Sequence, residues 1–102
     1  MAANESDYTL QTITETGTGD AINVNRKKKV TVVVSGTPSG NDIDIEYTLD
    51  NPRKSSPTWH KLATNVLGTS NPYKAEFSTP IQGVRYDCDA YNSDVTFEVL
   101  QG

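Results

Sequence analysis

Residues 42–50 contain the pattern that most restricts how this chain can fold. Apolar side chains stand at Ile43, Ile45, Tyr47 and Leu49, and polar side chains occupy the positions between them. In an extended strand, this alternation places every apolar group on one face and every acidic or hydroxyl group on the other. A helix would spread the apolar groups around its circumference and would bury unpaired carboxylates at a large cost in free energy. The segment is therefore expected to be a half-buried strand that packs against a second sheet.

Shorter segments with strand character follow one another along the rest of the chain, separated by turns rich in Gly, Pro, Asn and Ser. Residues 30–34 form the most β-branched run, which is typical of a strand covered on both faces. The loop from this run to 42–50 favours an antiparallel hairpin, and the short loop 92–94 favours a second hairpin between 84–91 and 95–99. The other expected strands are 8–12, with Tyr8, Leu10 and Thr12 on one face, 21–24, 58–62 and 74–78.

These features predict an all-β fold, an antiparallel β-sandwich of Ig-like or jelly-roll type with about seven or eight short strands. Leu, Ala and Met, which favour helices, are scarce, and no segment has the periodicity of a helix of three turns. A chain of 102 residues has the length of one domain. We expect a polar N-terminal arm at 1–7 and a single sandwich domain at 8–102, with Val66 and Leu67 as buried anchors of the irregular segment 63–73.

The charge and the cysteine content exclude several functional classes. A formal net charge of -4 and a pI near 4.7 argue against nucleic acid as a ligand, because gripping phosphates requires a basic excess. Cys88 is the only cysteine, so an intramolecular disulfide or a zinc site built on paired cysteines is excluded. Neither a secretion signal nor an apolar run that could span a bilayer is present, so we expect no membrane contact and synthesis in a reducing cytoplasm.

The acidic residues of 42–50 look at first like the start of a calcium loop. Such a loop needs a glycine-bearing turn to bring its oxygen ligands together, whereas Ile43 and Ile45 fill the intervening positions here. We therefore interpret the carboxylates as a solvated strand face and predict no metal site. Asp87 and Asp89 repeat the spacing, and on a neighbouring strand they would repel the first set unless Lys, Arg or a cation lay between them.

No group of residues points to catalysis or to a cofactor. His60 is the only histidine, no nucleophile motif is present, and an alternating acidic face does not provide the cleft that paired carboxylates need in a glycosidase. Cys88 alternates with Tyr86 and Ala90 on the expected inner face, so it is interpreted as a small core residue. The chain is predicted not to be an enzyme and to bind no cofactor.

Residues 26–29 are the one dense group of positive charges in an acidic chain. They can be interpreted as a solvated approach to a strand that discourages edge pairing, or as a docking site for the acidic surface of a protein. The N-terminal arm and the loop that leads to Trp59 are further candidates for contact with a partner. The predicted partner-binding residues are Asn4, Glu5, Arg26, Lys27, Lys28, Lys29, Arg53, Lys54 and Trp59.

Several segments taken together resemble the small virion proteins of tailed bacteriophages. The pattern consists of Ile43-x-Ile45-x-Tyr47-x-Leu49-Asp50, a loop, Trp59-x-x-Leu62, Phe77, Pro80-Ile81-x-Gly83-Val84-Arg85 and a closing β-hairpin. It spans about three quarters of the chain. The resemblance implies a β-sandwich that decorates or cements the head or occupies a tail position, and it carries over no catalytic residue.

We therefore expect a non-enzymatic virion protein, made in the host cytoplasm, that binds the major capsid protein or another virion protein and forms a homo-oligomer. A capsid decoration or cement protein is favoured, and a tail or head-tail accessory protein is an alternative. A carbohydrate-binding β-sandwich module is a second alternative, in which Trp59, Tyr73 and Tyr91 would form a stacking platform for a sugar.

Overall fold

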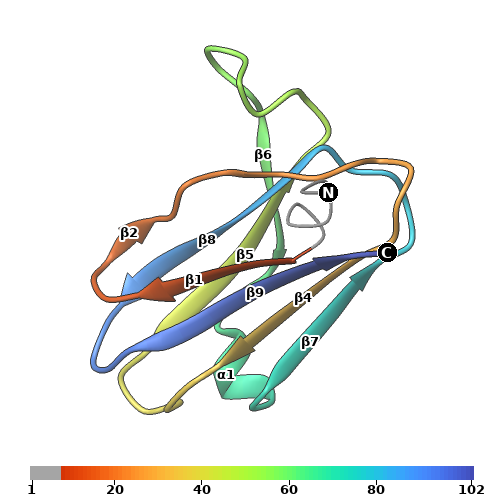
Figure 1. Ribbon diagram of the computed structural model, residues 1–102. Coiled ribbons are helices and arrows are strands. Elements are labelled where there is room, and N and C mark those ends of the chain that lie inside the picture. Colours follow the sequence, from red (N-terminus) through yellow and green to blue (C-terminus); the bar gives the residue numbers. More distant parts are fainter. Residues whose placement is uncertain (1–7) are drawn as a thin grey trace.

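The computed structural model describes residues 8–102, which form nine β-strands and one short helix (Figure 1). The elements are β1 (Tyr8–Ile13), β2 (Gly17–Thr18), β3 (Ile22–Asn23), β4 (Val30–Ser35), β5 (Asp42–Thr48), β6 (Trp59–Ala63), α1 (Val66–Thr69), β7 (Tyr73–Phe77), β8 (Gly83–Ala90) and β9 (Val95–Gln101). The prediction of an all-β fold is confirmed. Among the described residues, no helix is long and apolar enough to cross a membrane.

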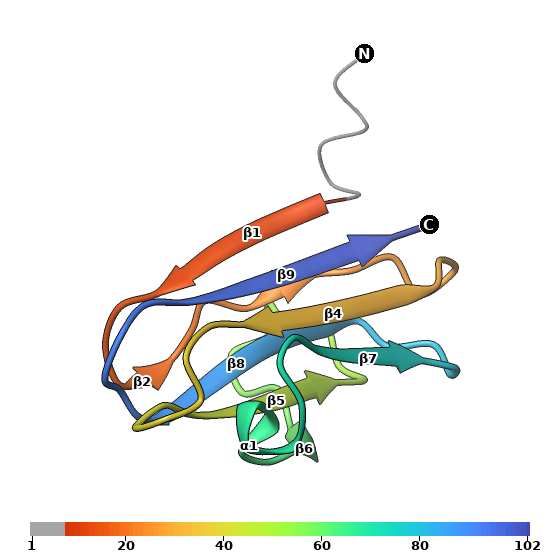
Figure 2. The same ribbon diagram turned by 90° about the horizontal axis from the view of Figure 1, so that it is seen from below.

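Two antiparallel sheets pack face to face as a sandwich (Figure 2). One sheet has the strand order β1-β9-β4-β7, and the other has the order β2-β8-β5-β6, with β3 also paired to β8. When β2 and β3 are counted as one interrupted strand, the chain changes sheet at every connection except the one from β5 to β6. This is the eight-stranded arrangement of a jelly roll, so the structure decides between the two predicted types of sandwich.

Both predicted hairpins are wrong. Strands β4 and β5 lie in different sheets, and so do β8 and β9, so the two connecting loops are crossovers between the sheets. Strand β5 instead forms a hairpin with β6 and pairs on its other side with β8. Alternation tells which face of a strand is buried, but it does not tell which strand lies beside it, and a loop rich in Gly and Ser serves a hairpin or a crossover equally well.

The core lies between the sheets, where both turn their apolar side chains inward. The three valines of β4 that face inward are at most 1% exposed, and Ile43 and Ile45 of β5 are 0% exposed. The alternation in β5 therefore predicted its apolar inner face correctly, whereas β4, which was expected to be covered on both faces, alternates between buried and half-buried residues. Leu49 is 55% exposed, because β5 ends at Thr48 while the apolar pattern continues into the loop.

Strands β8 and β1 each expose apolar residues. In β8, Cys88 is buried as predicted, but Ala90 is exposed at the end of the strand. In β1, the face that carries Tyr8, Leu10 and Thr12 turns to solvent, with Tyr8 and Leu10 48% and 52% exposed, while Ile13 at the end of the strand is buried. The face of β1 that turns to the core carries mainly polar residues.

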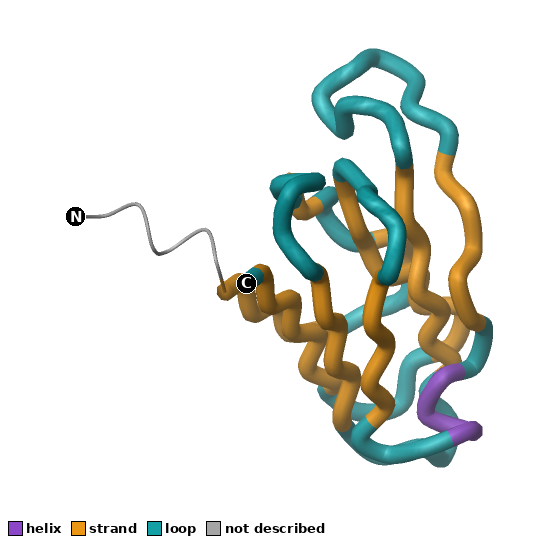
Figure 3. Tube along the Cα trace, turned by 90° about the vertical axis from the view of Figure 1, so that its right-hand side faces the viewer, coloured by secondary structure: helices purple, strands orange, loops and turns teal. Residues whose placement is uncertain are grey.

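Loops gather at the two ends of the sandwich (Figure 3). At one end, α1 contacts β4, β5 and β7 and buries Val66 and Leu67, which confirms both residues as core anchors. The same end holds the β4–β5 and β8–β9 crossovers, and the opposite end holds the loops β3–β4, β5–β6 and β7–β8.

Asn41 joins the two crossover loops. Its side chain is buried, with the residue only 2% exposed. The carboxamide oxygen accepts hydrogen bonds from the backbone N–H groups of Asn92 at 2.7 Å and Ser93 at 3.2 Å. The carboxamide nitrogen donates to the carbonyl oxygen of Thr37 at 2.7 Å and to the Ser93 hydroxyl at 3.2 Å. The hydrogen bonds of one side chain therefore hold the β4–β5 loop against the β8–β9 loop.

Candidate functional site

Most of the positive charge of the chain lies at one end of the sandwich. Residues 26–29 supply four exposed cations before β4, and Arg53 and Lys54 in the β5–β6 loop bring the total to six of the nine Lys and Arg residues. Lys28 and Arg53 line the same surface hollow, so the two loops lie next to each other. We call this region, residues 26–29, 53 and 54, the basic end.

Both loops of the basic end are built on the same turn. Asn25 accepts the N–H of Lys27 on its side-chain oxygen at 2.9 Å, and Asn51 accepts the N–H of Arg53 in the same way at 3.0 Å. In each loop the asparagine carbonyl oxygen also accepts the N–H of the residue three positions later, Lys28 or Lys54. Such turns are typical of asparagine, and each of these holds two cationic residues on the surface.

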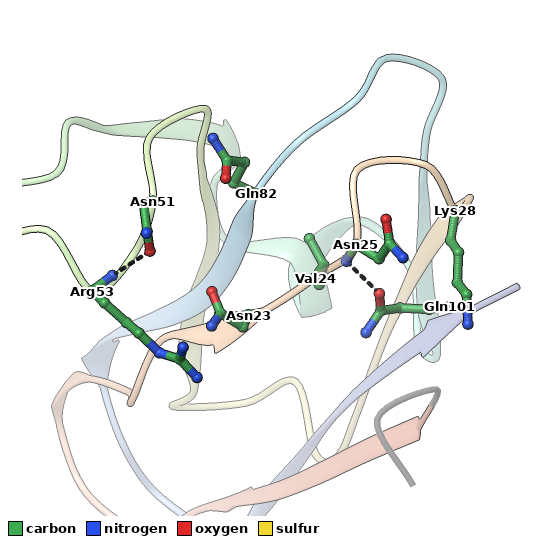
Figure 4. Close-up of a pocket in the computed structure, with 8 residues that line it drawn as sticks. All are labelled: Asn23, Val24, Asn25, Lys28, Asn51, Arg53, Gln82 and Gln101. Atoms are coloured by element: carbon green, nitrogen blue, oxygen red, sulfur yellow. Dashed lines mark hydrogen bonds between the residues drawn. The ribbon is translucent and has the colours of Figure 1, made fainter. Parts of the chain in front are cut away.

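A hollow of about 380 Å³ lies between the two turns (Figure 4). Its wall carries five side-chain amides, two cations and one valine: Asn23, Val24, Asn25, Lys28, Asn51, Arg53, Gln82 and Gln101. The carboxamide oxygens of Asn25 and Asn51 already accept backbone N–H groups, and the oxygen of Gln101 accepts the N–H of Asn25 at 2.6 Å. Asn25 and Asn51 use their carboxamide oxygens in these bonds, so their NH2 groups are the donors that they add to the wall. Gln82 donates its NH2 group to the carbonyl oxygen of Leu49 at 2.8 Å. With Lys28 and Arg53, the wall therefore combines amide donors with positive charge.

A second hollow of about 370 Å³ lies on the other side of the β3–β4 loop. It is lined by Arg26, Lys27, Lys28, Lys29, Phe77, Ser78, Thr79 and Pro80. Residues 26–29 thus form a cationic ridge between two depressions, and Lys28 lines both. A surface with this shape can receive loops of a partner on either side of the ridge.

The structure brings together only part of the predicted partner-binding set. Residues 26–29, 53 and 54 share the basic end, whereas Asn4 and Glu5 lie outside the described residues. Trp59 is half-buried, and the guanidinium carbon of Arg85 lies 4.2 Å from the centre of its ring. This contact covers one face of the indole, and contact of Trp59 with a partner stays a prediction.

The sugar-stacking platform is not formed. Trp59 opens β6 at the end of the sandwich that holds the β5–β6 loop, whereas Tyr73 opens β7 opposite Val34, at the end where β4 finishes. Tyr91 follows β8 at that same end and donates a hydrogen bond to Asp94 at 2.6 Å. Aromatic stacking of one sugar by all three side chains is therefore ruled out by their placement.

The acidic face of β5 is buried, which corrects the prediction of a solvated face. Asp44 is 3% exposed and Glu46 is 7% exposed, and Asp87 of the neighbouring strand β8 is half-buried beside them. Lys61 of β6 lies among these carboxylates, with Nζ 2.7 Å from Asp44, 2.9 Å from Asp87 and 3.3 Å from Glu46. Two neighbouring acidic strands need Lys, Arg or a cation between them, and Lys61 meets that requirement.

Further groups complete the carboxylate cluster, which comprises Asp44, Glu46, Asp87 and Asp89. Arg85 donates from Nε to Glu46 at 2.6 Å, and the backbone N–H of Asn65 donates to Asp44 at 2.9 Å. Burial alone would raise the pKa of Asp44, but hydrogen bonds from Lys61 and Asn65 outweigh burial, so the pKa is lowered. Hydrogen bonds to Asp44 and Asp87 raise the pKa of Lys61 in turn. The cluster therefore stabilises the sheet as a network of charges.

Asp89 is expected to make the stability of the fold depend on pH. Its hydrogen bond to Asp44, together with partial desolvation at the edge of the cluster, raises the pKa of Asp89 from 3.8 to about 6. The folded state therefore holds the Asp89 proton more tightly than the unfolded state does. The contribution of this proton to the free energy of unfolding is complete below pH 3.8 and is lost as the pH rises through about 6. Asp89→Asn keeps a donor for Asp44 at every pH, so it should stabilise the protein at pH 7.5 and have little effect at pH 4.

Urea unfolding of both proteins at the two pH values measures this difference. The gain at pH 7.5 should not exceed about 1 kcal/mol, because Asp89 is exposed and solvent screens its charge. A stability difference that is the same at pH 4 and pH 7.5 would contradict the shared proton.

Comparisons with known proteins bear on the fold. No known protein family matches the chain, and no curated protein is similar to it in sequence. Among solved structures, the crystal structure of the SPBc2 prophage-derived protein YomS is similar, with a TM-score of 0.60 and 16% sequence identity. The match covers 93% of this chain and 92% of that chain. At this identity the similarity concerns the fold alone, and the β-sandwich is the architecture that the two proteins share.

Proposed function

We propose that this chain is a non-enzymatic structural protein of a bacteriophage virion, and that its basic end docks on an acidic surface of the major capsid protein or of another virion protein. Within that class, decoration or cementing of the capsid is the role we favour. The surface charge of the molecule supports this mode of binding, and the fold supports the location in a virion.

The observation that carries the mode of binding is the charge of the basic end. Six of nine cationic residues meet there, although the whole chain has a net charge of -4. Lys61 and Arg85 are engaged with carboxylates, and Lys74 lies 3.9 Å from Glu76. Within the basic end, Lys54 lies 3.5 Å from Asp50, and the ridge at 26–29 consists of exposed side chains beside two hollows. Such a surface favours an acidic partner and sets its orientation and its association rate.

The fold and its structural neighbour support the place of action. Jelly rolls occur widely in viral capsid proteins, although they also occur in lectins. YomS, which has a similar fold, is described as a prophage-derived protein. A fold hosts many functions, so this support is an analogy, and the location has to be tested directly.

Immunogold electron microscopy tests the location. An antibody against this protein should label purified particles of the phage that encodes it, at regular positions on the head if the protein decorates the capsid. Label at the tail or neck would support the accessory role instead. Particles that carry no label at any position would contradict the proposal of a virion protein.

Matched charge reversals test the mode of binding. Lys27→Glu and Arg53→Glu should each weaken binding to particles that lack the protein on the order of ten-fold at low salt, because each introduces repulsion at the docking surface. Lys74→Glu changes the net charge by the same amount on the exposed side of β7, and it should alter binding less than about two-fold. Equal losses from all three variants would show that only total charge matters and would contradict docking through the basic end.

A further inference from the structure

The open edge of β1 is a second surface with the properties of an interface. Strand β1 is the last strand of its sheet and pairs on one side with β9. Its six residues, Tyr-Thr-Leu-Gln-Thr-Ile, include no charge, no proline and no glycine. An edge of this kind leaves unpaired backbone N–H and C=O groups that can take up another strand, and natural proteins normally protect such edges.

The other edges of the sandwich carry the usual protection. Strand β7 exposes Lys74 and Glu76, and β6 exposes His60 and Lys61 and has a shifted register against β5. Strands β2 and β3 have two residues each, which is too short to hold a partner strand. Among the described residues, β1 is therefore the one long edge without a charged side chain.

An exposed apolar patch lies beside this edge, on the outer face of the sheet. Tyr8 is directly opposite Leu100 of β9, and Leu10 is the next residue on the same face of β1. The three side chains are 48%, 41% and 52% exposed, respectively. The Tyr8 hydroxyl donates to Glu98 of β9 at 2.6 Å, so the side chain is tied to the neighbouring strand while about half of it stays exposed. Apolar groups clustered at an open edge are typical of a surface that is covered in an assembly.

We propose that β1 pairs with β1 of a second copy of this chain, which joins the two four-stranded sheets across a two-fold axis. The edge is complementary to an uncharged strand with apolar residues on its outer face, and β1 is itself such a strand. In antiparallel pairing, opposed residues lie on the same face of the sheet, so one residue has to be opposed to its own copy, with the two-fold axis midway between them. An axis between the two copies of Leu10 places Leu10 against Leu10 of the second copy, and Tyr8 against its Thr12.

This register brings no like charges together and covers the most exposed apolar side chain of the strand. From Tyr8 to Thr12, every opposed pair is neutral, so the repulsion that protects β6 and β7 is absent. The proposal does not rest on a virion role, and it uses a face of the molecule that does not include the basic end.

Analytical ultracentrifugation tests self-association. The wild-type protein should change from 11.1 kDa to about twice that mass as its concentration rises. Leu10→Lys places two ammonium groups at the two-fold axis and should raise the dimer dissociation constant at least ten-fold. Leu62→Lys is the matched control, because Leu62 is a 40% exposed leucine on the edge strand β6, and it should dimerise like the wild type. Circular dichroism confirms that each variant is folded.

Cysteine cross-linking tests the register. Opposed residues in an antiparallel pair have Cα atoms about 4.5–5.5 Å apart, within the range that a disulfide spans. Leu10→Cys should therefore form a covalent dimer with diamide as the oxidant at least ten times faster than Leu62→Cys. Cys88 is 2% exposed and should contribute no cross-link.

Three results would overturn the proposal. One is a wild-type protein that stays at 11.1 kDa at every concentration tested. Another is a dimer that Leu10→Lys leaves intact, or one in which Leu10→Cys cross-links no faster than Leu62→Cys. The third is a monomeric wild type whose binding to phage particles is lost in Leu10→Lys, which would assign the edge to a strand of a different protein.

Discussion

Asn41→Ala is expected to lower the free energy of unfolding by about 3 kcal/mol, one of the two largest losses that we predict for a single side chain. The substitution leaves the backbone N–H groups of Asn92 and Ser93 and the carbonyl oxygen of Thr37 without their partner. Because Asn41 is 2% exposed, water has little access to replace these bonds. In a domain of this size, such a loss corresponds to a fall in Tm on the order of 15 °C.

Thermal and urea unfolding, monitored by circular dichroism, measure the effect of Asn41→Ala. Asn92→Ala is the matched control, because the exposed Asn92 side chain makes a single weak bond, from its amide nitrogen to Ser39 O at 3.3 Å. Its loss should stay below about 1 kcal/mol. Asn41→Asp keeps the acceptor and removes both donors, so it should fall between the two alanine variants. If Asn41→Ala and Asn92→Ala cost the same, Asn41 does not hold the crossover loops together.

Lys61→Met is expected to cost about 2–3 kcal/mol at pH 7, where the carboxylate cluster is charged. The variant keeps the apolar length of the side chain but removes the ammonium group that bonds to Asp44, Asp87 and Glu46. Breaking a buried ion pair leaves an uncompensated charge, which costs about 3–5 kcal/mol, and we reduce this value because the Lys61 side chain is 44% exposed.

The pH dependence of the Lys61→Met effect follows from the sign of the pKa shift of Asp44. Hydrogen bonds from Lys61 help to hold the pKa of Asp44 down, so they stabilise the folded state above pH 3.8 and lose this effect as the pH falls through the lowered pKa. The difference in urea unfolding between the wild type and Lys61→Met should therefore shrink as the pH falls toward 3.

Lys74→Met provides the control for the loss of a charge. The Lys74 side chain is 65% exposed and lies 3.9 Å from Glu76, so its removal should change stability by less than about 0.5 kcal/mol. If Lys61→Met has an equally small effect, or one that is the same at pH 7 and pH 3, the carboxylate cluster does not depend on this lysine.

The sequence predicted the class of fold because local patterns carry that information. Alternation in β5 identified its apolar inner face, and Val66 and Leu67 were identified as anchors although α1 itself was not predicted. In β1, by contrast, the apolar residues Tyr8 and Leu10 are exposed. An apolar side chain at the edge of a sheet is equally compatible with a core and with an interface, and one sequence does not distinguish between them.

The residues of the candidate site were proposed from the sequence, and the structure adds how they are arranged. The cations of 26–29, together with Arg53 and Lys54, were selected for their charge and their position in loops. These two loops meet at one end because, in the jelly-roll order, β5 ends at the same end of the sandwich at which β4 begins. A signal that sequence analysis missed is the repeated turn at Asn25 and Asn51, where an asparagine precedes a pair of cationic residues in each loop.

By itself, the sequence determined that this chain forms strands, that the isoleucines of β5 lie in the core, and that its positive charge is concentrated in two loops. Each of these properties depends on residues that are near neighbours along the chain. Tertiary structure alone decided that the loops after β4 and β8 are crossovers, that Lys61 lies among the carboxylates of β5 and β8, and that β1 is an open edge. These properties depend on which strands lie side by side, and strand pairing is set by packing between segments far apart in the sequence.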